Sequence, residues 1–298
     1  MRIYGKTQRT PESVLSAGAF FPCSAARFAL QCVYTSWREV SGVKEIASVH
    51  NSTVQALREL QKTRGRREAG LFIAEGGKLV GEALALGLCR TLLVQADRLS
   101  QHEQLVRSAT DAGCDVLSVS AAVMQAVCET KTPQGVACAA AIPPQAQMLD
   151  GSLLVALDGV QDPGNVGTIV RTADAAGFDG VLLGEGCADL YSPKALRATM
   201  GSALRMRVLR TDDLPGELEG LKRRGYAVAA TELGGEDFYA RCPRRHAVLV
   251  IGSEGRGVSQ AVRDTATHHL ALPMRGGAES LNAAVAAGIM MYEMAREI

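Results

Sequence analysis

The stretch Asp158-Gly-Val-Gln-Asp-Pro-Gly-Asn-Val-Gly-Thr-Ile-Val-Arg171 follows a short apolar run and leads into a helical pattern. Two later stretches also follow apolar runs: Val250-Ile-Gly-Ser-Glu-Gly-Arg-Gly257 and Leu272-Pro-Met-Arg-Gly-Gly-Ala-Glu-Ser-Leu-Asn282. Apolar runs that end in turn residues predict buried strands followed by loops. Loops at strand ends, held by a packed sheet, are where α/β proteins place their chemistry. The three stretches therefore predict an α/β unit whose functional site forms where these loops converge.

Ahead of this unit lies a second region of regular pattern. Residues 45–142 alternate between strand and helix patterns, which predicts a smaller α/β unit. Two prolines and a polar stretch at 143–150 predict a linker. The last unit spans 151–298. Its strands are expected at 153–157, 180–183, 206–210, 227–231, 247–251 and 269–272.

The first 44 residues differ in composition from the rest. They hold four arginines, several serines and only two acidic residues, Glu12 and Glu39. We expect residues 1–44 to be a poorly ordered leader without catalytic residues. A transit peptide and a true start further in, near Val43, are the alternatives.

Two helices of the last unit have predicted bounds and predicted residue roles. Asn165 is expected to cap a helix at about 166–176, in which Arg171 either serves the site or pairs with Asp174 one turn on. The final helix is expected at 280–298. Its apolar residues share one stripe: Leu281, Val285, Gly288, Ile289 and Tyr292.

Composition limits the possible functions. The chain has 298 residues, a net charge of +1 and no apolar stretch near the ~20 residues that a membrane-spanning helix needs. We therefore expect no membrane partner, and any nucleic-acid contact must come from local basic patches. The eight cysteines form no C-x-x-C pair, which predicts reduced core residues, no metal site and a cytoplasmic location.

The glycine-rich loop at 252–257 matches neither common phosphate-binding pattern. No Gly-Lys-Ser/Thr follows it, so it is not a Walker loop, and its glycine spacing differs from the dinucleotide fingerprint. Glycines still allow close approach of backbone to a ligand. A carboxylate between glycines, Glu254, suits a cationic or amide partner rather than a phosphate.

Taken together, the three stretches resemble one family. Asn-Val-Gly-x-x-x-Arg-Thr-Ala, Ile-Gly-Ser-Glu-Gly-x-Gly and Leu-Pro-Met-…-Ser-Leu-Asn-x-x-x-Ala look like the three motifs of the SpoU (TrmH-type) RNA ribose 2′-O-methyltransferases, which belong to the SPOUT superfamily. The likeness covers residues 151–298. Residues 45–142 look like the ribosomal-protein-like substrate-binding domain often fused in front, through Leu71-Phe-Ile-Ala-Glu-Gly-Gly-Lys78.

The resemblance implies a fold, a cofactor and an assembly. It implies an α/β-knot domain with a deep trefoil knot, which general rules of chain topology would exclude. It also implies S-adenosylmethionine as cofactor and a homodimer with the active site near the interface. The positions matching the cofactor site are Gly252, Leu272 and Leu281. Those matching the catalytic polar residues are Arg171, Asn165, Glu254, Ser280 and Asn282.

The implied reaction needs no metal, because the sulfonium methyl group is already electrophilic. A ribose hydroxyl is a weak acid, so the enzyme must align it and help its proton leave. Arginine stays protonated at ordinary pH. Our hypothesis is that Arg171 holds an RNA phosphate and the hydroxyl together and lowers the barrier electrostatically.

Two clusters of basic residues are candidates for RNA contact. Residues 62–67 are expected to form a basic turn, and a second cluster lies near the proposed site. The second cluster comprises Lys194, Arg197, Arg205 and Arg207. The candidate RNA-binding residues are Arg197 from this cluster and, from the basic turn, Lys62, Arg64, Arg66 and Arg67. A front domain that reads folded RNA by shape favours ribosomal RNA over transfer RNA as substrate.

Three other functions stay open at this point. The first is a transfer-RNA ribose 2′-O-methyltransferase, and the second is a non-catalytic RNA-binding protein of the same fold. The third is a nucleotide-cofactor oxidoreductase, with Glu185 at about the place of a ribose-binding acid.

Overall fold

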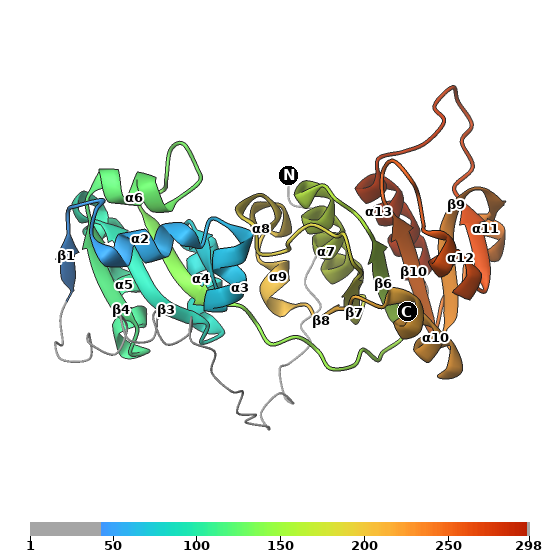
Figure 1. Ribbon diagram of the computed structural model, residues 1–298, viewed down its shortest axis with the longest axis horizontal. Coiled ribbons are helices and arrows are strands. Elements are labelled where there is room, and N and C mark those ends of the chain that lie inside the picture. Colours follow the sequence, from blue (N-terminus) through green and yellow to red (C-terminus); the bar gives the residue numbers. More distant parts are fainter. Residues whose placement is uncertain (1–42, 297–298) are drawn as a thin grey trace.

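The computed structural model describes residues 43–296, which form two α/β units side by side (Figure 1). The leader predicted at 1–44 lies outside the described residues, except for Val43 and Lys44. None of the helices in the described part is both long and apolar enough to cross a membrane.

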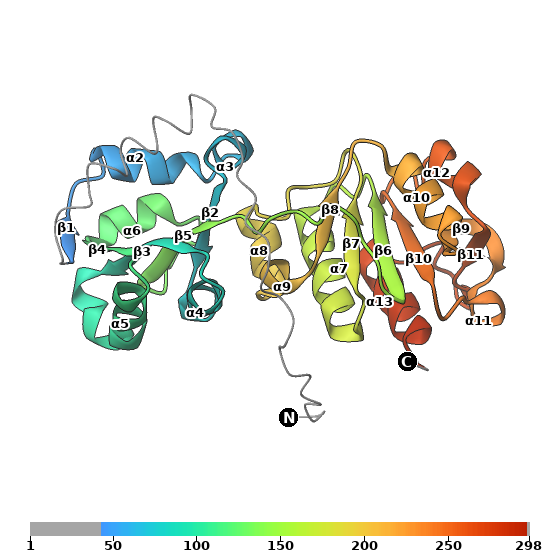
Figure 2. The ribbon, with the colours of Figure 1, turned by 90° about the horizontal axis from the view of Figure 1, so that it is seen from below.

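The front unit is a five-stranded sheet with the order β1-β4-β3-β5-β2, in which β5 runs antiparallel to its neighbours. The strands are β1 (Lys44–Ile46), β2 (Leu71–Glu75), β3 (Cys89–Gln95), β4 (Asp115–Val119) and β5 (Val136–Ala141). The helices are α2 (Ser52–Glu59), α3 (Thr63–Ala69), α4 (Gly77–Ala85), α5 (Glu103–Asp111) and α6 (Ala121–Val127), with the short η1 (Ala96–His102) before α5. Helices α2 and α6 cover one face of the sheet, and α4 and α5 cover the other (Figure 2).

The C-terminal unit is a six-stranded parallel sheet with the order β11-β9-β10-β6-β7-β8. The strands are β6 (Leu153–Asp158), β7 (Gly180–Leu183), β8 (Val208–Arg210), β9 (Ala227–Asp237), β10 (Ala247–Gly252) and β11 (His268–Ala271). The helices are α7 (Pro163–Ala176), α8 (Pro193–Thr199), α9 (Ser202–Arg205), α10 (Leu214–Arg223), α11 (Phe238–Arg241), α12 (Gln260–Thr265) and α13 (Ala283–Met294). Helices α7 and α13 pack on one face of the sheet, and α10 and α12 pack on the other (Figure 2).

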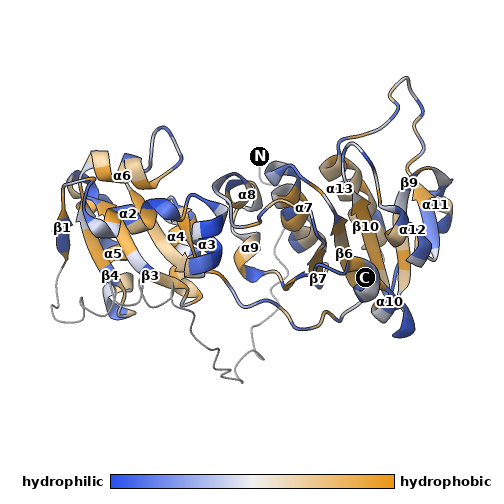
Figure 3. Ribbon diagram, viewed as in Figure 1, coloured by the Kyte–Doolittle hydropathy of each residue, from blue (hydrophilic) through white to orange (hydrophobic). Residues whose placement is uncertain are grey.

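The strands of this sheet carry the apolar runs that predicted them. Every residue of β10 is buried, and the central strands form the most hydrophobic layer of the unit (Figure 3). The sequence of a parallel strand is a continuous apolar run because helices cover both faces of the sheet. The predicted α/β fold class is confirmed. Strand β9 differs from its prediction, since it continues to Asp237 and pairs along this extension with β11 after a bulge.

Helix α7 begins before its predicted start. Asp162 caps it by accepting a hydrogen bond of 2.9 Å from the backbone N–H of Asn165, and Pro163 is the first helical residue. Proline suits that position because its ring already holds φ at a helical value. The first residue of a helix also has no intrahelical acceptor for an N–H, so the lack of that group costs nothing. The prediction that Asn165 caps this helix is therefore wrong, and its side chain is left to contact other loops.

Helix α13 is shorter than predicted and turns its apolar stripe to solvent. It begins at Ala283, after the capping side chain of Asn282, which accepts hydrogen bonds from the backbone N–H groups of Ala284 and Val285. The stripe predicted from helical periodicity is not the face that packs on the sheet. Its large side chains are exposed in the single chain: Leu281 40%, Val285 52%, Ile289 39% and Tyr292 56%.

The chain crosses back over the sheet after its edge strand. Strand β11 lies at the edge beside β9, whereas α13, which follows it, packs against α7 and β10 nearer the centre. Such a return is compatible with the predicted trefoil knot, which itself stays a prediction.

A buried ion pair and an aromatic contact join the two units. Arg66 of α3 is 2% exposed, and its Nη2 donates to Asp189 Oδ2 across 2.6 Å. The rings of Phe72 and Tyr191 lie with their centroids 5.3 Å apart. Residues 142–152 form neither helix nor strand, in agreement with the linker expected at 143–150. The division into domains at these boundaries stays a prediction.

Candidate active site

A cavity of about 670 Å³ lies beside the middle of β9 and the carboxyl end of β10, and we call it the loop cavity. Its wall includes the loop after β10, the loop after β11 and the first part of α13. All three predicted cofactor-binding residues line it, together with three of the predicted catalytic residues. These are Gly252, Leu272 and Leu281, and Glu254, Ser280 and Asn282.

Gly252 permits the fold of the loop that bounds this cavity. A Cβ atom at position 252 would lie 2.1 Å from the carbonyl carbon of Gly257 and 2.2 Å from the backbone nitrogen of Val258. The loop folds back on itself through paired backbone hydrogen bonds of 3.0 Å and 2.8 Å between Ser253 and Gly257. Only glycine allows backbone to approach this closely, so the end of β10 forms a cradle of backbone groups.

A chain of hydrogen bonds joins the three motifs. The side-chain amide of Asn165 donates to Glu254 Oε1 across 2.6 Å. The amide of Asn282 donates to Asn165 Oδ1 across 3.0 Å. Because Asn282 also caps α13, its carbonyl oxygen is occupied and its amide must donate. The chain fixes the orientation of each amide and locks the start of α7 to both glycine-bearing loops.

Arg171 lies apart from this cluster within the single chain. It is exposed, lies on α7 six residues after Asn165 in the same motif, and is not among the residues that line the loop cavity. It makes no hydrogen bond or ion pair with the residues that the structure describes. The alternative of a pair with Asp174 is wrong, because that carboxylate accepts hydrogen bonds from Arg205 and Ser202.

Several residues that line the loop cavity were not among the predicted site residues. Thr231, Glu232 and Leu233 border the loop cavity from the extension of β9. Thr231 ends a strand predicted at 227–231, and Glu232 and Leu233 follow it, so the strand-end argument applied to the other loops would have found them. Asp158, at the end of β6, accepts a hydrogen bond of 2.6 Å from the backbone N–H of Ser259 and fixes the far side of the loop.

A charged pair supports the start of α7. Lys194 of α8 donates to the carboxylate of Asp162, the capping residue of α7. This contact and the backbone N–H of Asn165 hold the pKa of Asp162 below its usual value. Asp162 therefore stays ionised as a cap, and α8 is tied to the site.

The proposed basic patches are mostly paired within the chain. Arg66 is not available to RNA, because its guanidinium donates to Asp189, to the carbonyls of Leu60 and Gln61, and to Thr63. The prediction that it belongs to an exposed basic turn is wrong, since α3 turns it inward. Other members keep an acidic partner on the surface: Lys62 with Glu59, Arg64 with Glu68, Arg197 with Glu129, Arg205 with Glu82, and Arg207 with Asp150. Arg67 is exposed and has no ion pair in the described chain.

Both units match known families. Residues 152–292 match the SpoU rRNA Methylase family, and residues 51–138 match the MRM3-like substrate binding domain. Among curated relatives, the chain is 36% identical over 254 residues to the 23S rRNA (guanosine(2553)-2'-O)-methyltransferase RlmP of Bacillus subtilis. That match covers 85% of this chain and 99% of the relative.

Solved structures show the same arrangement of both units. An AdoMet-bound rRNA methyltransferase from Sinorhizobium meliloti superposes with a TM-score of 0.76 at 35% identity, covering 86% of this chain and 98% of the other. The SpoU methyltransferase AviRb from Streptomyces viridochromogenes, in complex with AdoMet, gives a TM-score of 0.75 at 28% identity, covering 83% and 98%. The motifs that meet at the loop cavity, the family match and these likenesses agree: the chain belongs to the SpoU/TrmH family of RNA methyltransferases.

Proposed function

We propose that this chain transfers the methyl group of S-adenosylmethionine to a ribose 2′-hydroxyl of ribosomal RNA. The observation that carries the proposal is the Glu254–Asn165–Asn282 hydrogen-bond chain, which gathers all three family motifs at the loop cavity. The likeness to RlmP over most of both chains supports ribosomal RNA as the substrate. The match of residues 51–138 supports an RNA-binding role for the front unit.

The loop cavity suits S-adenosylmethionine in shape and chemistry. Leu272, Leu281 and Met290 supply apolar surface for a purine, and the backbone cradle at Gly252 supplies polar groups for its edge and for the ribose. When bound, the cofactor supplies a sulfonium methyl group that is already electrophilic. The residues of this chain therefore have to act on the ribose hydroxyl.

Two groups act on the ribose hydroxyl: the hydrogen-bonded cluster of Glu254, Asn165 and Asn282, and the guanidinium of Arg171. Asn165, held between Glu254 and Asn282, presents fixed amide groups beside the cavity and can orient the ribose. Arg171 carries a permanent positive charge and no internal partner. It clamps a phosphate next to the target ribose and stabilises the charge that develops on the 2′-oxygen as its proton passes to solvent water.

In the proposed homodimer, Arg171 of one protomer lies beside the loop cavity of its partner. Helices α7 and α13 pack together with Thr172 next to Gly288, where an added Cβ atom would lie 3.7 Å from the threonine methyl group. Arg171 precedes Thr172 and is exposed, and we place it near the exposed stripe of Val285, Ile289 and Tyr292. Leu281 belongs to the same stripe and lines the loop cavity. An isologous contact through this stripe places Arg171 of one protomer beside the cavity of the other.

Replacing Ile289 by Asp is expected to convert the dimer to monomers, because two carboxylates would face an apolar interface without partners. Sedimentation should show the change of mass, and methyl transfer should fall with it. Leu86, which is 47% exposed, belongs to the front unit and does not line the loop cavity, gives the matched control. A Leu86→Asp dimer of normal mass is expected, and an Ile289→Asp variant that stays dimeric would rule out this interface.

The proposed reaction is tested by incubating the full chain with labelled S-adenosylmethionine and unmodified ribosomal or transfer RNA. Label should enter ribosomal RNA at one ribose, where it blocks alkaline cleavage of the adjacent phosphodiester. Label in transfer RNA alone would contradict the substrate class, and label on bases would contradict the reaction.

The cysteines support a cytoplasmic location. The six in the described chain are free. Burial raises the pKa of Cys114 and of Cys128 to about 12, so these thiols stay protonated and unreactive. Reduced core thiols are typical of a reducing compartment.

A further inference from the structure

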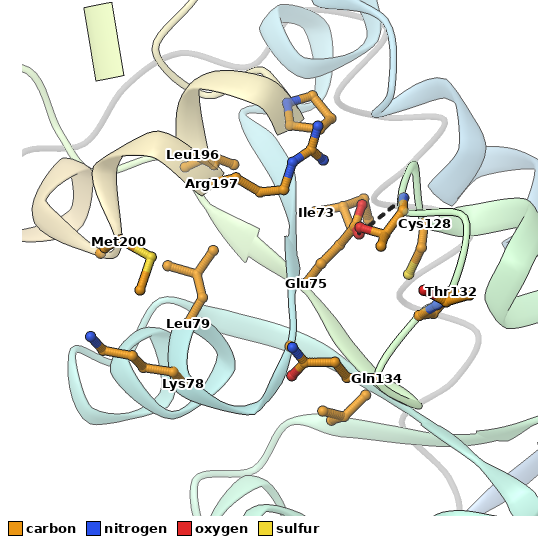
Figure 4. A pocket seen from close by; sticks show the side chains of 16 residues that line it. Ile73, Glu75, Lys78, Leu79, Cys128, Thr132, Gln134, Leu196, Arg197 and Met200 are labelled. Carbon is orange, nitrogen blue, oxygen red and sulfur yellow. Dashed lines mark hydrogen bonds between the residues drawn. The ribbon is translucent and has the colours of Figure 1, made fainter. Parts of the chain in front are cut away.

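A second cavity, of about 500 Å³, lies between the two units, and we call it the interunit cleft (Figure 4). Strand β2, helix α4 and the loop at 128–134 form its front-unit side, and α8 forms its C-terminal side. Its volume is in the range of small-ligand sites. Apolar side chains line it from both units: Ile73, Leu79, Val136, Leu196 and Met200.

The rim of the cleft carries polar groups without internal partners. Lys78, Thr132 and Gln134 line it, and their side chains make no hydrogen bond or ion pair with any residue in the described range. They offer a cation, a hydroxyl group and an amide with both a donor and an acceptor. Apolar walls and a rim of mixed donors and acceptors match a nucleobase, which has two apolar faces and a polar edge.

The floor of the cleft is held in place before any ligand arrives. The carboxylate of Glu75 accepts hydrogen bonds from the backbone N–H groups of Glu129 and Thr130. Arg197 closes the other side through a 2.7 Å contact with Glu129. The acidic groups of the cleft are thus already paired, and the loop at 128–134 is fixed against β2.

Met200 is held at the mouth of the cleft in a strained conformation. Its φ is +50°, and it is one of two non-glycine residues in the described chain with a positive φ. Its side chain is 46% exposed, so burial does not explain its presence. Its left-handed backbone ends α8 at a position that glycine usually fills, and the methionine side chain found there instead lines the cleft.

Helix α8 connects the cleft to the active site. Lys194, near its start, donates to Asp162, which caps α7 three residues before Asn165. Met200, at its end, lines the cleft. The helix places the two positions about 9 Å apart along its axis, which is within reach of one RNA strand.

From this geometry we propose that the interunit cleft binds an unpaired base of the substrate RNA, near the methylated nucleotide. The base lies between the apolar side chains of the two units, with its edge toward Gln134 and Thr132. Lys78 contacts the adjoining phosphate. This inference rests on the proposed function, since it assumes an RNA substrate.

Charge reversal tests the rim of the cleft. Lys78→Glu is expected to raise KM for in vitro transcribed ribosomal RNA about tenfold and to leave kcat and S-adenosylmethionine binding unchanged. Arg245→Glu is the matched control, because Arg245 is exposed, has no ion pair in the described chain, precedes the central strand β10 and does not line the cleft. Equal KM values for the two variants would overturn the proposal.

Relief of strain tests Met200 independently of charge. Met200→Gly is expected to raise Tm, because glycine adopts a positive φ without cost, and to raise KM for the RNA about fivefold. His246, with φ +45°, is the other strained residue. His246→Gly should leave KM unchanged, and a Met200→Gly variant with normal KM would contradict a role in RNA binding.

Crosslinking separates this proposal from the reaction itself. Wild-type chain irradiated with 4-thiouridine-containing ribosomal RNA should yield crosslinked peptides from 73–79, 128–136 or 193–201, and Lys78→Glu should weaken them. Methyl transfer without these crosslinks overturns the cleft and leaves the enzyme intact. Crosslinks without methyl transfer support the cleft and overturn the reaction, and the absence of both overturns both.

Discussion

Arg171→Ala is expected to lower kcat for methyl transfer by about 10²–10³-fold, the usual cost of removing one charged or hydrogen-bonding group that stabilises a transition state. The reason is that Arg171 is a permanent cation without an internal partner, on a helix that borders the exposed stripe of α13. Its loss removes no contact that stabilises the single chain. Steady-state kinetics with ribosomal RNA would measure the effect.

Binding of S-adenosylmethionine provides the internal control. Arg171 does not line the loop cavity of its own chain, and its proposed partner is an RNA phosphate rather than the cofactor, so calorimetry should give a Kd for the cofactor within about twofold of wild type. Arg171→Lys should recover only part of the rate, because lysine keeps the charge without the planar fork that binds a phosphate. Normal turnover in Arg171→Ala would refute the assignment.

Gly252→Ala is expected to weaken S-adenosylmethionine binding by at least about 100-fold, and to abolish methyl transfer at ordinary cofactor concentrations. The new Cβ atom would lie within 2.2 Å of the backbone of both Gly257 and Val258. Those atoms belong to the main chain, so they cannot move aside as a side-chain tip can. The loop must open, and Glu254 is then carried away from Asn165.

Gly255→Ala is the matched control in the same loop. A Cβ atom at position 255 meets nothing within 4 Å, and Gly255 does not need a positive φ. Its Kd for the cofactor should stay within about twofold of wild type. If Gly252→Ala bound the cofactor as tightly as Gly255→Ala, the backbone cradle would not be the cofactor site.

Mixing the two inactive variants would show which protomer supplies Arg171. In a mixed dimer of Arg171→Ala and Gly252→Ala chains, one site carries both defects and the other carries neither if the residues come from different protomers. Random mixing should then restore roughly a quarter of wild-type activity. Arg171 acting within its own chain would restore none.

The features that follow most directly from the sequence are the local ones. The buried runs of β6 and β10 follow from helices covering both faces of a parallel sheet, and the polar loops follow from their ends. The family, its cofactor and its reaction class were all predicted from three motifs, and the family match confirms them. The catalytic roles assigned to Arg171 and its neighbours stay predictions.

The features that follow least directly are those in which a residue's partner lies far along the chain. Arg66 lies in a basic stretch that predicts an exposed patch. Its carboxylate partner, however, is 123 residues away in the other unit. The stripe on α13 follows helical periodicity, yet the side of α13 that packs on the sheet carries Ala287 and Met291 instead. Periodicity shows that an apolar face exists and does not show what will cover it.

The sequence by itself determined the strands, the loops that end them and the chemistry of the residues they carry, because strand and turn preferences act over a few neighbouring residues. Only the tertiary structure decided that Asn165 bonds to Glu254, 89 residues on, and accepts from Asn282, 117 residues on. It alone decided that Arg171 is exposed and does not line the loop cavity of its own chain. The physical reason is that hydrogen-bond partners are selected by the packing of whole strands and helices, which brings together groups that no local pattern connects.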